Sequence, residues 1–110
     1  PLVEVIPDSQ TDALIIPTLE AFLVSSLGKS VITAKDTPNF IANRIGVFSM
    51  MAILEYADKF QIPFEVVDQL TGKNLGRAKS ATFRTADVVG LDTFAHVVAT
   101  MTAKCDDGFE

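Results

Sequence analysis

Apolar and polar positions divide the chain into two parts with different periodicity. In the first part, residues 2–6 and 30–34 are rich in β-branched side chains, which predicts two short strands. Between them, apolar residues recur at spacings of three and four as far as Gly28, which predicts a helix with Thr11 as N-cap and a kink at Pro17. A strand, a helix and a strand in so few residues are typical of the end of an α/β sheet.

From Asp36 onward the pattern is helical only. Thr37 and Pro38 combine a capping hydroxyl with proline at a first helical position, which predicts a long helix that ends near Phe60. The other predicted elements are a helix over 63–70, a polar loop over 74–80, a helix over about 82–89, and a last helix capped by Asp92 or Thr93 and running towards Lys104. The predicted fold is mostly α, with a strand–helix–strand region over residues 1–35 and a multi-helix domain over residues 36–110.

Composition narrows the class of protein. Apolar residues make up 48% of the 110 positions and charged residues 21%, which is enough for a packed core. The net charge of −5 argues against a nucleic-acid or anionic-membrane partner, since either needs a basic surface. Cys105 is the single cysteine, so we expect no internal disulfide and a cytoplasmic location. The chain opens on an apolar segment without Met, which is typical of a piece of a longer protein.

Glu4 is the first candidate for chemistry. Strand alternation places it between Leu2 and Ile6 on one face. Spacing alone favours an edge-strand carboxylate that faces water, because glutamate is rarely buried. The alternative is an acid that orients and charges a histidine elsewhere, as the third group of a catalytic triad does.

Asn43 is the second candidate. It shares a stripe at helical spacing with four apolar residues, Phe40, Val47, Met50 and Leu54. A buried asparagine bonded to neighbouring backbone is the more common reading of this pattern. The alternative is a side-chain amide aimed at a substrate carbonyl, where it stabilises developing negative charge.

Basic side chains are concentrated in residues 76–80 and at Arg84, in an otherwise acidic chain. A basic loop with a glycine before a helix suits a phosphate group, although a solvated turn has the same composition. His96 is the only histidine, but it lies beside the apolar side of its predicted helix, so we do not predict a catalytic role for it. Cys105 and the two acidic residues after it lack the spacing of a metal site. No glycine-rich dinucleotide-binding fingerprint occurs in the sequence.

Three segments together resemble the 3-hydroxyacyl-CoA dehydrogenases. The run Asp36–Arg44 resembles that family's D-T-P-G-F-I-x-N-R segment, and Leu2–Ile6 resembles its L-V-E-V-I strand. Lys79–Thr93 is similar to the version in the longer bacterial and archaeal members, some of which are fused to an enoyl-CoA hydratase. One departure is Asn39, where many members have glycine; we expect it at an early position of the helix.

The resemblance implies an activity and a set of roles. The family oxidises the L-3-hydroxyl of an acyl-CoA to a ketone and passes hydride to NAD during fatty-acid β-oxidation. Carried over by motif, Glu4 pairs with the histidine that takes the hydroxyl proton, and Asn43 helps to bind the substrate's oxygen. Lys79 and Ser80 of the basic loop are expected to bind substrate.

The resemblance also implies an organisation. Residues 1–35 would be the end of a Rossmann-like NAD-binding domain, with the histidine and NAD held by a region before Pro1. Residues 36–110 would be a substrate-covering and dimerisation domain like the C-terminal domain of 6-phosphogluconate dehydrogenase. The parent would be a homodimer, possibly fused to an enoyl-CoA hydratase, and these residues alone would be inactive. The rival interpretation is a stand-alone helical module that binds a protein partner through its apolar faces.

Overall fold

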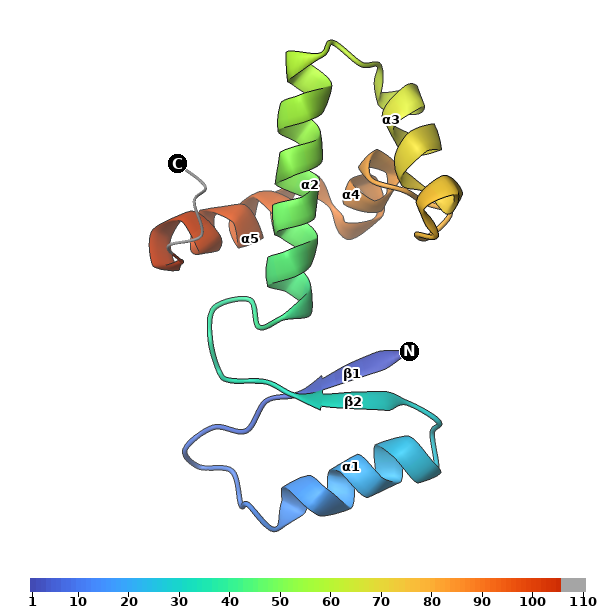
Figure 1. Cartoon of the computed structure of the whole chain (residues 1–110). Coiled ribbons are helices and arrows are strands. Elements are labelled where there is room, and N and C mark those ends of the chain that lie inside the picture. Colours follow the sequence, from blue (N-terminus) through green and yellow to red (C-terminus); the bar gives the residue numbers. More distant parts are fainter. Residues whose placement is uncertain (106–110) are drawn as a thin grey trace. The chain divides into compact units, whose positions relative to one another are not determined.

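The computed structural model describes residues 1–105. Within them the chain forms two compact units, Pro1–Ile41 and a second unit that begins at Ala42 (Figure 1). Together they hold five α-helices and one small parallel sheet, so the prediction of a mostly helical chain with a strand–helix–strand segment is confirmed.

The first unit is built on two paired strands. Strand β1 (Leu2–Val5) pairs in parallel with β2 (Ser30–Thr33), and Glu4 lies opposite Ile32. Helix α1 (Ile15–Ser25) connects them and packs against β2 (Figure 1). Val5 and Ala34 are the buried residues of this unit. No residue of α1 is fully buried: Ile16 and Leu23 are half-buried, and the other large apolar side chains of α1 are exposed.

Two details of α1 differ from the prediction. Thr11 does not cap the helix: its hydroxyl donates to Asp8 Oδ1 at 2.7 Å inside the preceding turn. Pro17 is the third residue of α1, not an interior one. The amide of a first-turn residue has no partner within its helix, so proline there costs no hydrogen bond and the predicted kink has no cause. The end of the helix agrees with the prediction, because Gly28 takes φ of 59° and its amide donates to the carbonyl of Val24.

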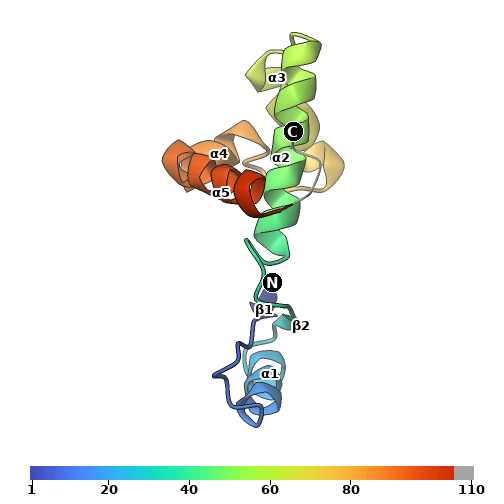
Figure 2. The same ribbon diagram turned by 90° about the vertical axis from the view of Figure 1, so that its left-hand side faces the viewer.

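In the second unit, the described residues up to Cys105 form helices and turns only. Helices α2 (Ala42–Lys59), α3 (Phe64–Thr71), α4 (Phe83–Val89) and α5 (Leu91–Lys104) are joined by short turns, one of which is the 3-10 helix η1 (Lys73–Leu75). Figures 1 and 2 show α5 crossing α2, while α3 and α4 lie together. The buried apolar side chains come from all four helices: Val47 and Ala57 of α2, Val67 of α3, Ala86 of α4 and Met101 of α5.

The segment before α2 is a turn, and the prediction that the long helix begins at Thr37 and Pro38 is wrong. The amide of Phe40 donates to the carbonyl of Thr37 at 3.0 Å, while Asn39 has φ of 62°. Proline second and a left-handed residue third are the arrangement of a type II turn. Proline fits both the first position of a helix and the second position of this turn. Only the left-handed backbone of the residue after it distinguishes the turn from a helix start. Asn39 is therefore a turn residue rather than an early helical one.

A side chain of α3 ties this helix to α4. The Asp68 carboxylate accepts backbone hydrogen bonds from Thr82, Phe83 and Arg84, at 3.0, 2.7 and 3.1 Å. Beside it, the hydroxyls of Thr71 and Thr82 lie 2.7 Å apart, and Thr82 is buried. The start of α4 is thus capped by a residue of another helix, and residues 72–81 form a loop between two fixed ends.

The last helix begins two or three residues earlier than predicted. Gly90 precedes it with φ of 95°, and no side chain caps it. Asp92 and Thr93, predicted as alternative caps, lie in its first turn instead. The φ of Gly90 favours glycine here, and a Cβ would also require the Asp92 carboxylate, 2.8 Å away, to move.

Candidate functional site

Glu4 is half-buried and has a defined backbone partner. It is the next-to-last residue of β1, and its Oε2 accepts a 2.8 Å hydrogen bond from the amide of Ile41. The carboxyl ends of parallel strands are where α/β sheets place their ligands. A carboxylate held in this way is better suited to a fixed role than an edge-strand glutamate that moves freely in water.

Asn43 lies in the first turn of α2, and its side chain is exposed. The more common reading, a buried asparagine, is therefore wrong. Phe40 also leaves the predicted stripe, because it precedes the helix. Asn43 instead lines a cavity of about 270 Å³ between α2 and α5, together with Ala42, Gly46, Val47, Met50, Val89, Thr93, Phe94 and Val97. At the edge of a mostly apolar cavity, an amide can donate to a ligand oxygen.

The basic loop has a different structure from a helix-terminus phosphate site. Lys79 is exposed, whereas Ser80 is half-buried and accepts a 2.8 Å hydrogen bond from the hydroxyl of Thr85. The amides that open α4 donate to Asp68, so they are not available to a phosphate. An anion at this loop would be bound by side chains such as Lys79, without support from the helix.

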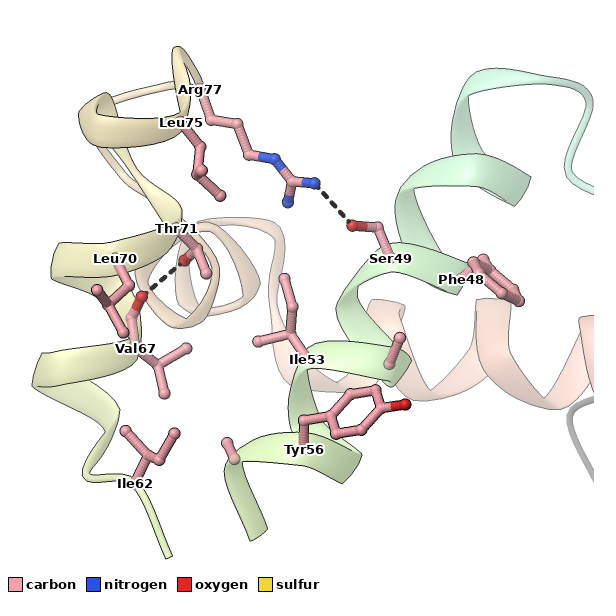
Figure 3. A pocket seen from close by; sticks show the side chains of 12 residues that line it. Phe48, Ser49, Ile53, Tyr56, Ile62, Val67, Leu70, Thr71, Leu75 and Arg77 are labelled. Carbon is pink, nitrogen blue, oxygen red and sulfur yellow. Dashed lines mark hydrogen bonds between the residues drawn. The ribbon is translucent and has the colours of Figure 1, made fainter. Parts of the chain in front are cut away.

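A second cavity of about 420 Å³ lies between α2 and α3 (Figure 3). Its lining is almost wholly apolar: Phe48, Ala52, Ile53, Tyr56, Ala57, Ile62, Val67, Leu70 and Leu75, with Ser49, Thr71 and Arg77 as the polar members. The Arg77 guanidinium donates to the Ser49 hydroxyl at 3.1 Å and so links the basic loop to α2. The cavity has the size and lining of a small-molecule pocket, but no group in it is placed for catalysis.

The connection from β1 to α1 does not fit the pyrophosphate of a dinucleotide. Its acidic side chains already bind its amides: Gln10 donates to Asp8 Oδ1 and Leu14 to Asp12 Oδ1, both at 2.9 Å. The hydroxyl of Thr11, followed by the amide of Gln10, holds the pKa of Asp8 below its usual range. Two carboxylates repel a phosphate where a cofactor loop offers glycines and free amides.

His96 and Cys105 are the other residues that the sequence offered for chemistry. His96 is exposed on α5. Within residues 1–105, no group of three or more His, Cys, Asp or Glu could hold a metal ion. Cys105 is half-buried and free, while the two acidic residues that follow it lie outside the described residues. Across the same described part, no helix is long and apolar enough to span a membrane.

Sequence reasoning missed Asp68 and the α2–α3 cavity. A local capping signal needs its acceptor beside the helix start, and Asp68 lies 14 residues before Thr82. The cavity depends on how α2 and α3 diverge, which periodicity does not specify. Arg77 belonged to the predicted basic loop, but its partner Ser49, 28 positions away, had no signal in the sequence.

Comparisons with known proteins agree on one class. The model of the 3-hydroxyacyl-CoA dehydrogenase C-terminal domain matches residues 40–110. A probable 3-hydroxyacyl-CoA dehydrogenase of Bacillus subtilis is 51% identical over 105 residues, which cover 96% of this chain and 13% of the relative. A protein of the same description from Deinococcus radiodurans is 48% identical over 96 residues, which cover 87% of this chain and 28% of the relative.

Two further matches have lower sequence identity. A putative fatty acid oxidation complex trifunctional enzyme of Rickettsia prowazekii is 32% identical over 109 residues, which cover 96% of this chain and 15% of the relative. The crystal structure of FadB2 from M. tuberculosis matches with a TM-score of 0.81 and 26% identity, over 98% of this chain and 38% of FadB2. The chain thus spans a minor part of each of these proteins.

The fold and the comparisons point to one class of protein, that of the relatives just described. Within it, the chain belongs to the 3-hydroxyacyl-CoA dehydrogenase family, and the matched domain covers its helical unit.

Proposed function

We propose that this chain is part of an NAD-dependent enzyme that oxidises L-3-hydroxyacyl-CoA to 3-ketoacyl-CoA in fatty-acid β-oxidation. The observation that carries the proposal is the 51% identity to a probable 3-hydroxyacyl-CoA dehydrogenase over 96% of the chain. A match of that length extends over both units of the chain. In this proposal residues 1–35 end the nucleotide-binding domain, and residues 36–110 form the substrate-covering domain.

Each proposed site residue has a role that its surroundings support. Glu4, anchored by the Ile41 amide, orients a histidine of another region and stabilises its protonated form. Asn43, exposed at a cavity rim, donates to the substrate oxygen as negative charge develops there. Lys79 and Ser80 bind the substrate from the loop before α4.

The hydride acceptor is bound outside these residues. NAD would accept the hydride, but the acidic β1–α1 connection does not fit its pyrophosphate. The sequence also lacks a glycine-rich fingerprint. Glu4 and Asn43 orient a proton-accepting group and the substrate. We expect the 110-residue chain to be inactive alone.

The decisive experiment is Glu4→Gln in the full-length enzyme. The substitution keeps the shape of the side chain and an acceptor for Ile41, but it removes the charge that stabilises a protonated histidine. We expect kcat to fall and the histidine's pKa to fall as well, because an opposite charge nearby favours the charged form. The acidic limb of the pH–rate profile would then move to lower pH. A Glu4→Gln enzyme with unaltered kcat and pH profile would refute the assigned role.

We also propose that the parent is a cytoplasmic homodimer that associates through its helical unit. The support is the exposed apolar side of α2, where Ile45, Phe48, Tyr56 and the adjoining Phe60 are between 50% and 65% exposed. Relatives described as trifunctional enzymes support a fusion to an enoyl-CoA hydratase. A stand-alone interaction module would explain the apolar side of α2, but it gives no reason for an anchored carboxylate at the end of β1.

A further inference from the structure

The backbone before α2 takes a conformation that few side chains adopt. Asn39 and Phe40 have consecutive φ values of 62° and 51°. A Cβ in this region lies too close to the following carbonyl oxygen, so two adjacent residues other than glycine are rarely found there. Asparagine tolerates the conformation better than most residues, whereas a bulky aromatic residue does not. Surrounding contacts must hold such a backbone in place.

This backbone conformation produces a contact with the carboxylate of Glu4. The turn closes with the 3.0 Å bond from the Phe40 amide to the Thr37 carbonyl. The next peptide, between Phe40 and Ile41, carries the amide that donates to Glu4 Oε2 at 2.8 Å. The backbone angles of Phe40 set the direction of this peptide, so the left-handed pair aims the Ile41 amide at Glu4.

We infer that the Thr37–Phe40 turn positions Glu4, with Asn39 as the positioning residue. The inference rests on the proposed function, because it assigns the turn a purpose only if Glu4 acts in catalysis. A glutamate side chain on a strand can adopt several rotamers, and the Ile41 amide is one of the contacts of Glu4 in the structure. A fixed amide on one carboxylate oxygen selects the rotamers that keep this contact, and so fixes the direction in which the carboxylate meets a partner.

A series of substitutions at Asn39 tests the inference, because it predicts the order of their effects on kcat. Asn39→Gly adopts the same φ without steric cost, so it should keep wild-type kcat and pH–rate profile. Asn39→Val resists positive φ most, and Asn39→Ala is intermediate. In the full-length enzyme, kcat should fall from Gly to Ala to Val, by roughly tenfold or more for Val, the equivalent of one hydrogen bond to a charged group. The acidic limb of the pH–rate profile should move to lower pH, as we expect for Glu4→Gln.

A second readout is independent of turnover. Hydrogen exchange of the Ile41 amide should be slow in the wild type and in Asn39→Gly. It should be faster by about tenfold or more in Asn39→Val and Glu4→Ala, since both lose a charge-assisted bond. Gln61 supplies the matched control: it has φ of 50° in the turn after α2, and its side chain is exposed. Gln61→Val should lower stability but leave Ile41 exchange and the pH–rate profile unchanged.

The outcomes separate the two proposals. If Asn39→Val speeds Ile41 exchange but kcat and the pH–rate profile stay at wild-type values, the positioning role is wrong. The same conclusion follows if Gln61→Val shifts the profile equally, because the effect would then be general destabilisation. If Asn39→Val does not fold, Asn39→Ala gives the same comparison. An unaffected Glu4→Gln enzyme would instead remove the function of Glu4 itself.

Discussion

Asp68 accepts a 2.7 Å hydrogen bond from the amide of Phe83, the first residue of α4. The same carboxylate holds the amides on either side, so α4 has an N-cap supplied from α3. No residue next to α4 provides this cap: the structure shows no capping bond from the side chain of Thr82. The short α4 therefore depends on another helix for its first turn.

Replacement of Asp68 should destabilise the helical unit more than its exposure suggests. We expect Asp68→Ala to lower the free energy of unfolding by about 2–3 kcal/mol, since it removes a cap and a charge-assisted acceptor together. Asp68→Asn should cost less, because one oxygen remains. Urea denaturation measures both. Asp87→Ala, on an exposed position of α4, is the control and should change stability by less than about 0.5 kcal/mol.

Asn43→Ala should act mainly on catalysis in the full-length enzyme. If its amide stabilises the substrate oxygen in the transition state, kcat should fall by ~10²-fold or more, with a smaller change in KM. Steady-state kinetics with a 3-hydroxyacyl-CoA would show this. A rise in KM at constant kcat would mean that Asn43 only holds the ground state. Because the side chain is exposed, stability should change little.

The 110-residue chain alone should neither bind NAD nor oxidise a 3-hydroxyacyl-CoA. Its β1–α1 connection uses its amides internally, and its one histidine lies exposed on α5. Isothermal titration calorimetry with NAD should give no heat of binding. Micromolar binding would show that a cofactor site lies within these residues after all.

The chain should associate in solution through the exposed apolar side of α2. Light scattering at increasing concentration should report a dimer or larger species, and Phe48→Glu should shift it towards monomer because a charge would have to be buried. Val88, 78% exposed on α4, offers the control, since Val88→Glu should leave association unchanged. A clean monomer at high concentration would count against the proposed interface.

The sequence predicted elements better than their ends. The pattern of side chains predicted the five α-helices and both strands, because such a pattern extends over a whole segment, whereas η1 overlaps a predicted loop. The ends of an element depend on single residues and on distant partners, and the predicted starts of α1, α2 and α5 were wrong. Pro38 fits a helix start as well as a type II turn, and Asn39 decided for the turn. The first turn of α4 is held by Asp68, which no local pattern connects to it.

The candidate site was predicted through motif resemblance more than through physical pattern. Alternation made Glu4 notable, but not its bond to Ile41, since the two residues are 37 positions apart. Periodicity placed Asn43 on an apolar stripe, although its side chain is exposed beside a cavity. Composition suggested a phosphate loop, yet Asp68 occupies the amides that such a loop would use.

The loop over residues 72–81 begins and ends at a fixed place, because the hydroxyls of Thr71 and Thr82 lie 2.7 Å apart. A loop with its ends held together can grow at low cost, since doubling its length adds only about 0.6 kcal/mol of closure entropy. Insertions there should leave α3 and α4 undisturbed. Gly72 is an exception, because a Cβ there would lie 3.2 Å from that of Ala81. Added length is therefore tolerated in this loop at low cost to folding, while the residues at its base stay under constraint.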